Sequence, residues 1–162
     1  TFHPETVNFD KNKFFIKEIL NEIKILSKKY QIVITMPNAD TKGLLIRNEI
    51  EIFIKNCNNI YVYESLGMKA YLSFMKYCKI ILGNSSSAFV EASYFPKSVI
   101  NLGNRQEGRI ITPNIKSIKI DGQNILNAVK FFEDQNYNQK QSSYYGVGGS
   151  AKKIIDILKK IN

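Results

Sequence analysis

Apolar residues recur along the chain in two alternating patterns, one typical of amphipathic helices and the other of buried strands. Between residues 10 and 29 they follow the helical spacing, and Asp10 stands where an N-cap is expected. Residues 31–37 then form a largely apolar run that Pro37 ends, as in a strand buried on both faces. The same alternation predicts further strands at 59–64, 79–83, 98–103 and 117–121, and further helices at 41–57, 67–78, 87–95, 123–134 and 150–161.

The order of these elements predicts the fold class. Strands separated by helices of this length form βαβ units, which give a parallel sheet with helices on both faces. A chain of 162 residues has the size of one domain, so we expect a single Rossmann-like α/β domain over residues 1–162. In such a sheet, ligands bind beyond the carboxyl ends of the strands. The segments expected at those ends are 1–5, 36–40, 64–67, 82–91 and 101–109.

The segment GNSSS, residues 83–87, has the features of an anion-binding turn. Gly83 permits a tight exit from the preceding strand, and three serines occupy the cap and first turn of the next predicted helix. Free backbone N–H groups and the positive end of a helix dipole attract an anion there, and serine hydroxyls add small donors. The alternative, a serine that simply caps the helix, needs only one of the three hydroxyls. The segment therefore favours phosphate or diphosphate binding.

Other charged or titratable residues at the same edge have open roles. Glu91 lies four residues after Ser87, where its carboxylate either accepts hydrogen bonds from ribose hydroxyls or is a solvated surface group. Arg105 and Arg109 lie in a glycine-containing loop, where arginine binds phosphate through paired hydrogen bonds or pairs with an acid. His3, the only histidine, is either an acid–base or phosphate-binding group or an incidental polar residue.

Composition argues against several classes of protein. The net charge of +9 raises nucleic-acid binding as an alternative, but the lysines are scattered over polar helix faces, so we expect no nucleic-acid partner. Cys57 and Cys78 match no metal-ligand spacing, and we expect reduced thiols in a cytoplasmic protein without metal or cofactor. The longest uncharged runs, 80–90 and 141–151, are shorter than the roughly 18 residues of a membrane span, so we expect no membrane association.

Six segments carry a family likeness when they are taken together and in order. They are TFHPET, MPNAD, ESLG, ILGNSSSAFVEA, INLGNRQEGR and YYGVGGSAKKIIDIL. Over nearly the whole chain they resemble the C-terminal lobe of the UDP-N-acetylglucosamine 2-epimerases. The hydrolysing branch is the most similar, because FHPET stands where non-hydrolysing relatives usually have a motif rich in histidine and arginine. Only the combination of GNSSS, the following glutamate and GNRQEGR is specific to the family.

The resemblance implies a two-lobed fold of the glycosyltransferase-B type, with a sugar nucleotide between the lobes. This chain would be the second lobe alone. Ser85 and Ser86 would hold the diphosphate and Glu91 the ribose hydroxyls, while His3 would be a catalytic residue facing the reacting sugar. The nucleotide-binding residues would then be Asn38, Leu66, Ser85, Ser86, Ser87, Glu91 and Arg105.

The resemblance also implies a reaction and partners. UDP would be eliminated across C1 and C2 of UDP-N-acetylglucosamine, and water would add to the glycal with inversion at C2. The product would be N-acetylmannosamine or a relative, used for sialic-acid-like sugars. The acid–base residues would lie on the first lobe, so we expect this chain alone to bind nucleotide weakly without turnover. Its partners would be the UDP-sugar, its own first lobe and, at full length, further copies in a homo-oligomer.

Two departures from the family pattern leave alternatives open. Ala88 stands where the family commonly has glycine, and GVGG at 146–149 stands where an acidic residue is usual. The architecture is shared with the donor lobe of glycosyltransferases, and a Rossmann-like fold alone does not fix a function. Whether the nucleotide is UDP or GDP, and which amino sugar it carries, also stays open.

Overall fold

The structure, a computed structural model, describes residues 1–38, 43–55, 57–95, 97–134 and 144–161. Within them, five short strands form two parallel sheets. In one sheet β1 (Ile32–Thr35) pairs with β2 (Ile60–Tyr63). In the other, β4 (Ser98–Leu102) lies between β3 (Ile80–Gly83) and β5 (Ile115–Ile118). Every pair of strands is parallel, which confirms the predicted fold class.

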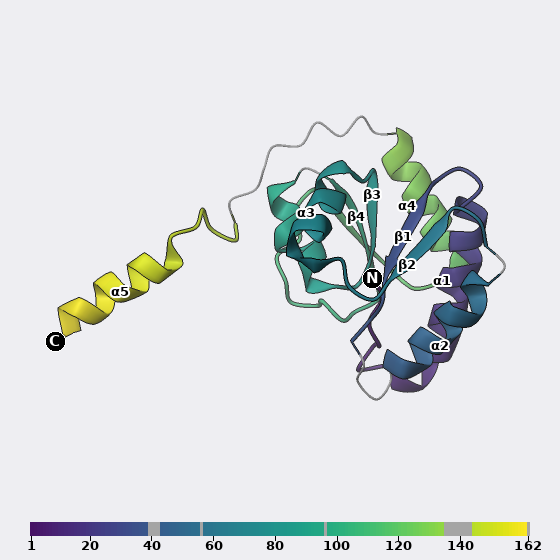
Figure 1. Ribbon diagram of the computed structural model, residues 1–162, viewed down its shortest axis with the longest axis horizontal. Coiled ribbons are helices and arrows are strands. Elements are labelled where there is room, and N and C mark those ends of the chain that lie inside the picture. Colours follow the sequence, from purple (N-terminus) through teal and green to yellow (C-terminus); the bar gives the residue numbers. More distant parts are fainter. Residues whose placement is uncertain (39–42, 56, 96, 135–143, 162) are drawn as a thin grey trace.

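Helices cover both sides of the strands (Figure 1). On one side lie α1 (Asn12–Leu26), α2 (Gly43–Ile54) and α4 (Gly122–Asp134), with α1 in contact with the other two. On the other side lies α3 (Gly67–Tyr77). The helix α5 (Ser150–Ile161) stands apart from this body, and all its residues are exposed. Three short 3-10 helices complete the described elements: η1 (Phe9–Lys11), η2 (Ser86–Ala88) and η3 (Glu91–Tyr94).

The central strand β4 contributes side chains to two cores. All five of its residues are buried. Successive side chains of a strand point to opposite faces. Accordingly, Ile100 and Leu102 pack in the large core with α1 and α4, whereas Val99 packs in a smaller one with Phe89 and Ala92. Burial on both faces explains why the adjacent residues Val99 and Ile100 are both apolar rather than alternating with polar ones.

The described residues form two sheets where the sequence suggested one. A cavity of about 520 Å³ lies between β1 and β3, which both line it. At one end of this gap the Asn84 N–H donates to the Thr1 carbonyl at 3.3 Å, and the Thr1 hydroxyl is hydrogen-bonded to that of Thr35. Gly83, with φ of +148°, permits this approach, because a Cβ there would lie 1.9 Å from the Thr1 carbonyl oxygen. Residues at the start of the chain, rather than a direct ladder, thus connect the two sheets.

Three local predictions need correction. Asp10 does not cap α1: it lies in η1, and the N-cap position is Lys11. The last strand is β5 at 115–118, earlier than the expected 117–121, because the register with β4 pairs Val99 with Ile115.

The stretch 87–95 is also not a continuous α-helix but two 3-10 turns, η2 and η3. Serine side chains compete with the helical backbone for hydrogen bonds, and the Ser93 hydroxyl donates to the Val90 carbonyl at 2.6 Å. The burial of Phe89, only 1% exposed, further fixes the path of this segment.

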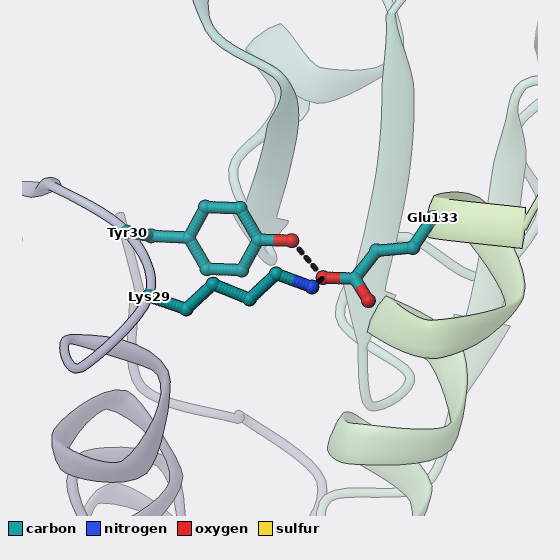
Figure 2. Close-up of polar contacts among 3 residues, drawn as sticks. All are labelled: Lys29, Tyr30 and Glu133. Carbon is teal, nitrogen blue, oxygen red and sulfur yellow. Dashed lines mark hydrogen bonds and ion pairs between the residues drawn. The ribbon is translucent and has the colours of Figure 1, made fainter.

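Polar contacts join the end of α1 to the end of α4 (Figure 2). The Tyr30 hydroxyl donates to Glu133 Oε1, and Lys29 Nζ lies 2.8 Å from the same oxygen. Lys29 is largely exposed, so its ion pair contributes little to stability. The half-buried Tyr30 holds the Glu133 carboxylate in place through its hydrogen bond. No helix in the described part of the chain has the length and apolar character needed to cross a membrane.

The carboxyl group of Glu22 on α1 provides a test of this packing. Its Oε2 is buried without a hydrogen-bond partner among the described residues. Its Oε1 packs closely on Gly122, where an added Cβ would lie 2.4 Å from this oxygen. Burial, and secondly the nearby Glu18 carboxylate, raise the pKa of Glu22. A raised folded-state pKa adds stability below the unfolded-state value of about 4.3, and this stability is lost as the pH rises through the folded-state pKa.

We therefore expect Glu22→Gln to raise the melting temperature at pH 7, and the difference from wild type to shrink toward pH 4. Thermal unfolding at both pH values measures this. Glu51→Gln, at an exposed position on α2, is the matched control and should show no such pH-dependent gain. A Glu22→Gln protein less stable than wild type at pH 7 would contradict the assignment.

Candidate functional site

The loops that follow β3 and β4 meet the N-terminal segment at one buried residue, Asn84. Its side chain is 0% exposed. The His3 N–H donates to Asn84 Oδ1 at 2.7 Å, and Asn84 Nδ2 donates to the His3 carbonyl at 2.8 Å. This reciprocal pair holds the backbone of the only histidine against the start of the serine-rich turn.

The backbone carbonyl of Asn84 anchors the arginine-containing loop. Arg105 Nη1 donates to it at 3.2 Å, and Gln106 Nε2 donates to it at 2.8 Å. Gln106 is buried, and its Oε1 accepts a hydrogen bond from Arg109 Nε at 2.6 Å. Both arginines are therefore connected to one carbonyl oxygen, Arg105 directly and Arg109 through the glutamine.

A buried carboxylate completes the network. Glu5 is 1% exposed, and its Oε1 accepts hydrogen bonds at 3.3 Å from both Asn84 Nδ2 and the Arg105 backbone N–H. The main chain of Glu5 is fixed in turn by Asn12, whose Oδ1 accepts from the Glu5 N–H at 2.7 Å and whose Nδ2 donates to the Glu5 carbonyl at 3.0 Å. The start of α1 thus supports the whole edge.

The three serines occupy different environments. Ser86 is exposed, and Ser85 is half-buried. Ser87 is buried, and its hydroxyl is hydrogen-bonded to the Tyr71 hydroxyl at 2.5 Å and to that of Ser85 at 3.0 Å. The backbone N–H groups of all three serines have no acceptor among the described residues. A turn with three such N–H groups is suited to bind an anion, although the short 3-10 helix that follows provides little macrodipole.

The remaining predicted residues make no hydrogen bond to this network within the part of the chain that the structure describes. Glu91 is half-buried in η3, so the regular helical face expected for it and Ser87 is not formed. Asn38 follows β1 and is exposed, while Ala39 and Asp40 of the same motif lie outside the described residues. Leu66 precedes α3 and lines the cavity together with Gly83. The nucleotide-binding role of each residue stays a prediction.

Electrostatics at this edge favour an anion. Neither Arg105 nor Arg109 forms an ion pair with a described residue, so pairing with an acid, considered above for Arg109, is not found. The described residues contain no group of three His, Cys, Asp or Glu side chains that could hold a metal ion. The edge therefore offers guanidinium groups and N–H donors that suit a phosphate group.

Sequence reasoning missed three residues of the network. Asn84, Glu5 and Gln106 are all buried and polar. Each stands inside one of the motifs GNSSS, FHPET and GNRQEGR, beside the serines, the histidine and the arginines that the sequence predicts as site residues. For Asn84 the available signal was a polar residue directly after the end of β3, since buried polar groups are normally hydrogen-bonded.

The same fold occurs in a solved UDP-N-acetylglucosamine 2-epimerase from Methanocaldococcus jannaschii, determined in complex with UDP-GlcNAc and UDP. The TM-score is 0.75 at 21% identity, and the match covers 93% of this chain and 42% of that one. The parallel strands, the helices on both sides and the loops joined at one edge define a Rossmann-like lobe of the glycosyltransferase-B type. Within that class, the chain belongs to the UDP-N-acetylglucosamine 2-epimerase family, whose model matches residues 1–159.

Curated relatives place the chain near hydrolysing members. It is 38% identical over 122 residues to the GDP/UDP-N,N'-diacetylbacillosamine 2-epimerase (hydrolyzing) of Campylobacter jejuni, covering 75% of this chain and 32% of the relative. It is 29% identical over 161 residues to the UDP-N,N'-diacetylbacillosamine 2-epimerase (hydrolyzing) of Legionella pneumophila, covering 99% and 41%. The chain therefore matches only 32% and 41% of the length of these two relatives, and it corresponds to their C-terminal part.

The serine environments lead to a stability prediction. Because the Ser87 hydroxyl is hydrogen-bonded and buried, Ser87→Ala should cost about 1 kcal/mol and lower the melting temperature by roughly 2–4 °C. Ser86→Ala, at an exposed position, is the control and should stay within about 0.5 kcal/mol of wild type. Tyr71→Phe should cost a similar amount, and the double variant should cost less than the sum, because both changes remove the same hydrogen bond. Additive losses would argue against the contact.

Proposed function

We propose that this chain is the nucleotide-holding, C-terminal lobe of a hydrolysing UDP-N-acetylglucosamine 2-epimerase. The observation that carries the proposal is the meeting of three loops at Asn84, next to the three serine N–H groups that lack acceptors. Family membership supports the reaction, and the hydrolysing relatives support the branch.

In the proposed complex, the diphosphate of the sugar nucleotide lies on the serine turn. The N–H groups of Ser85, Ser86 and Ser87 and the exposed hydroxyl of Ser86 donate to its oxygens. Arg105, held at its Nη1 by the Asn84 carbonyl, directs its other donors to the same group or to the nucleotide. Glu91 accepts from the ribose hydroxyls, and Asn38 and the backbone near Leu66 line the rest of the nucleotide pocket.

The proposed reaction requires removal of the C2 proton and departure of UDP from C1. As the C1–O bond breaks, negative charge builds on the diphosphate, where fixed N–H and guanidinium donors stabilise it. His3 faces the reacting sugar from this lobe, within reach of the bond that breaks. Water then adds across the glycal with inversion at C2, and the carboxyl groups that transfer protons belong to the other lobe.

The substrate, the compartment and the assembly are part of the proposal. The names of the two curated relatives point to a nucleotide-linked diacetamido sugar as a substrate to test beside UDP-N-acetylglucosamine. The free cysteines Cys57 and Cys78 support a reducing, cytoplasmic location. The products would serve sialic-acid-like sugar synthesis, and the full-length protein would assemble into a homo-oligomer.

Turnover by the full-length protein is the primary test. Incubated with UDP-N-acetylglucosamine, or with UDP- or GDP-N,N'-diacetylbacillosamine, it should release the nucleoside diphosphate and a free C2-inverted amino sugar. Chromatography and NMR of the products measure both. The 162-residue chain should release none, because it lacks the proton-transferring lobe. A new glycoside in the presence of an acceptor, or turnover by the isolated chain, would contradict the proposal.

Nucleotide binding is tested separately by thermal shift of the full-length protein. UDP at 100 times its dissociation constant should raise the free energy of unfolding by about 2.7 kcal/mol. Ser86→Ala and Glu91→Ala should each reduce the UDP-induced shift, because each removes a contact to the diphosphate or the ribose. Lys130→Ala, at an exposed position on α4, is the control and should keep the shift. Responses of both site variants equal to wild type would refute the assigned residues.

A further inference from the structure

The side chain of Asn84 uses every hydrogen-bonding group that it has toward the N-terminal segment. A side-chain amide offers an acceptor oxygen and two N–H donors. Here Oδ1 accepts from the His3 N–H, while Nδ2 donates to the His3 carbonyl and to Glu5 Oε1. Aspartate has nearly the same shape but no donor, so asparagine alone among residues of this shape satisfies all three contacts.

The backbone of the same residue contacts the arginine-containing loop and the first residue of the chain. Its carbonyl accepts from Arg105 and Gln106, and its N–H donates to the Thr1 carbonyl. Ser85, the first residue of the proposed diphosphate turn, follows directly in the chain. A displacement of Asn84 therefore moves the histidine segment, the serine turn and the arginine loop relative to one another.

Glu5 fixes the same arrangement from the opposite side. One carboxylate oxygen accepts from the side chain of Asn84 and from the backbone N–H of Arg105. Gly103, with φ of +71°, leaves the space for this oxygen, since a Cβ there would lie 2.4 Å from it. Asn84 and Glu5 are both almost completely buried. Leaving either side chain without its partner would cost free energy, so their relative position is strongly determined.

We propose that Asn84 and Glu5 form a positioning pair that holds His3 in register with the diphosphate turn and with Arg105. This inference rests on the proposed function, because it assigns the pair a role in that reaction. Neither side chain is placed on the substrate: both act through the residues that they hold. A positional error of about 1 Å at a reacting group can lower the rate by roughly 100-fold.

The test uses the full-length protein and the nearly isosteric variants Asn84→Asp and Glu5→Gln. Asn84→Asp keeps the acceptor for the His3 N–H, removes both donors and sets a second carboxylate beside Glu5. We expect kcat to fall about 100-fold. The affinity for UDP should change much less, because the serine N–H groups and the Asn84 carbonyl remain.

The double variant makes the test specific. In Asn84→Asp combined with Glu5→Gln, the glutamine Nε2, placed where Glu5 Oε1 lies, can donate to the new aspartate and removes the second carboxylate, although the Arg105 N–H then loses this acceptor. The hydrogen bond between positions 84 and 5 is thereby restored with its direction reversed. We expect kcat to recover at least 10-fold over Asn84→Asp, and the thermal unfolding of the four proteins to show non-additive coupling.

A matched control separates positioning from general destabilisation. Asn114 is also buried and hydrogen-bonded at both side-chain atoms, but it directly precedes β5, at the amino end of the strands and away from the site. Asn114→Asp should lower the melting temperature and leave kcat, measured well below that temperature, within about 3-fold of wild type. This bound corresponds to less than 1 kcal/mol in the barrier.

Three results would overturn the inference: a wild-type kcat in Asn84→Asp, an equal loss of kcat in Asn114→Asp, or no recovery in the double variant. Failure of the proposed function gives a different pattern, because wild-type protein would then turn over none of the nucleotide sugars. Even in that case, additive unfolding energies for positions 84 and 5 would disprove the pair, since that measurement needs no substrate.

Discussion

The buried amide of Asn84 provides the hydrogen bonds on which the arrangement of the candidate site depends. The N-terminal segment, the serine turn and the arginine-containing loop are distant in sequence and meet at Asn84. Polar groups of these segments would be unpaired without the hydrogen bonds of Asn84. The cost of an unsatisfied buried group exceeds the modest net gain of a hydrogen bond. The network therefore adds little to the free energy of unfolding, but it strongly disfavours any other arrangement of the three segments, because such an arrangement would leave buried groups unpaired. That selectivity is what a site built from loops requires.

The elements could be predicted from the sequence where burial gave a clear pattern. In β4, for example, the adjacent residues Val99 and Ile100 are both apolar because both faces of the strand are covered. The pattern failed where tertiary contacts decide: the register with β4 sets the bounds of β5, and the burial of Phe89 and the local serine hydrogen bonds break the expected helix at 87–95. Neither effect leaves a periodic signal in a single sequence.

The candidate site could be predicted only in part, for a similar reason. Serine and arginine residues after strand ends indicate anion binding by their chemistry, so the turn at Ser85 and the loop at Arg105 were proposed as an anion site, a role that stays a prediction. Asn84 and Glu5 were not proposed, because an amide or a carboxylate has no local signature of a tertiary partner about 80 residues away. The family likeness gave the order of the motifs but not the hydrogen bonds that join them.

The way in which the arginines are held bears on how the edge can bind an anion. Arg105 rests on a neutral carbonyl oxygen and Arg109 on a neutral amide oxygen. The buried carboxylate of Glu5 accepts the backbone N–H of Arg105 rather than its guanidinium. A guanidinium paired with a carboxylate would lose much of its attraction for phosphate, whereas one held by neutral acceptors keeps its full charge. The short 3-10 helix after the serine turn has only a weak dipole, so the guanidinium charges are the stronger electrostatic attraction for an anion at this edge.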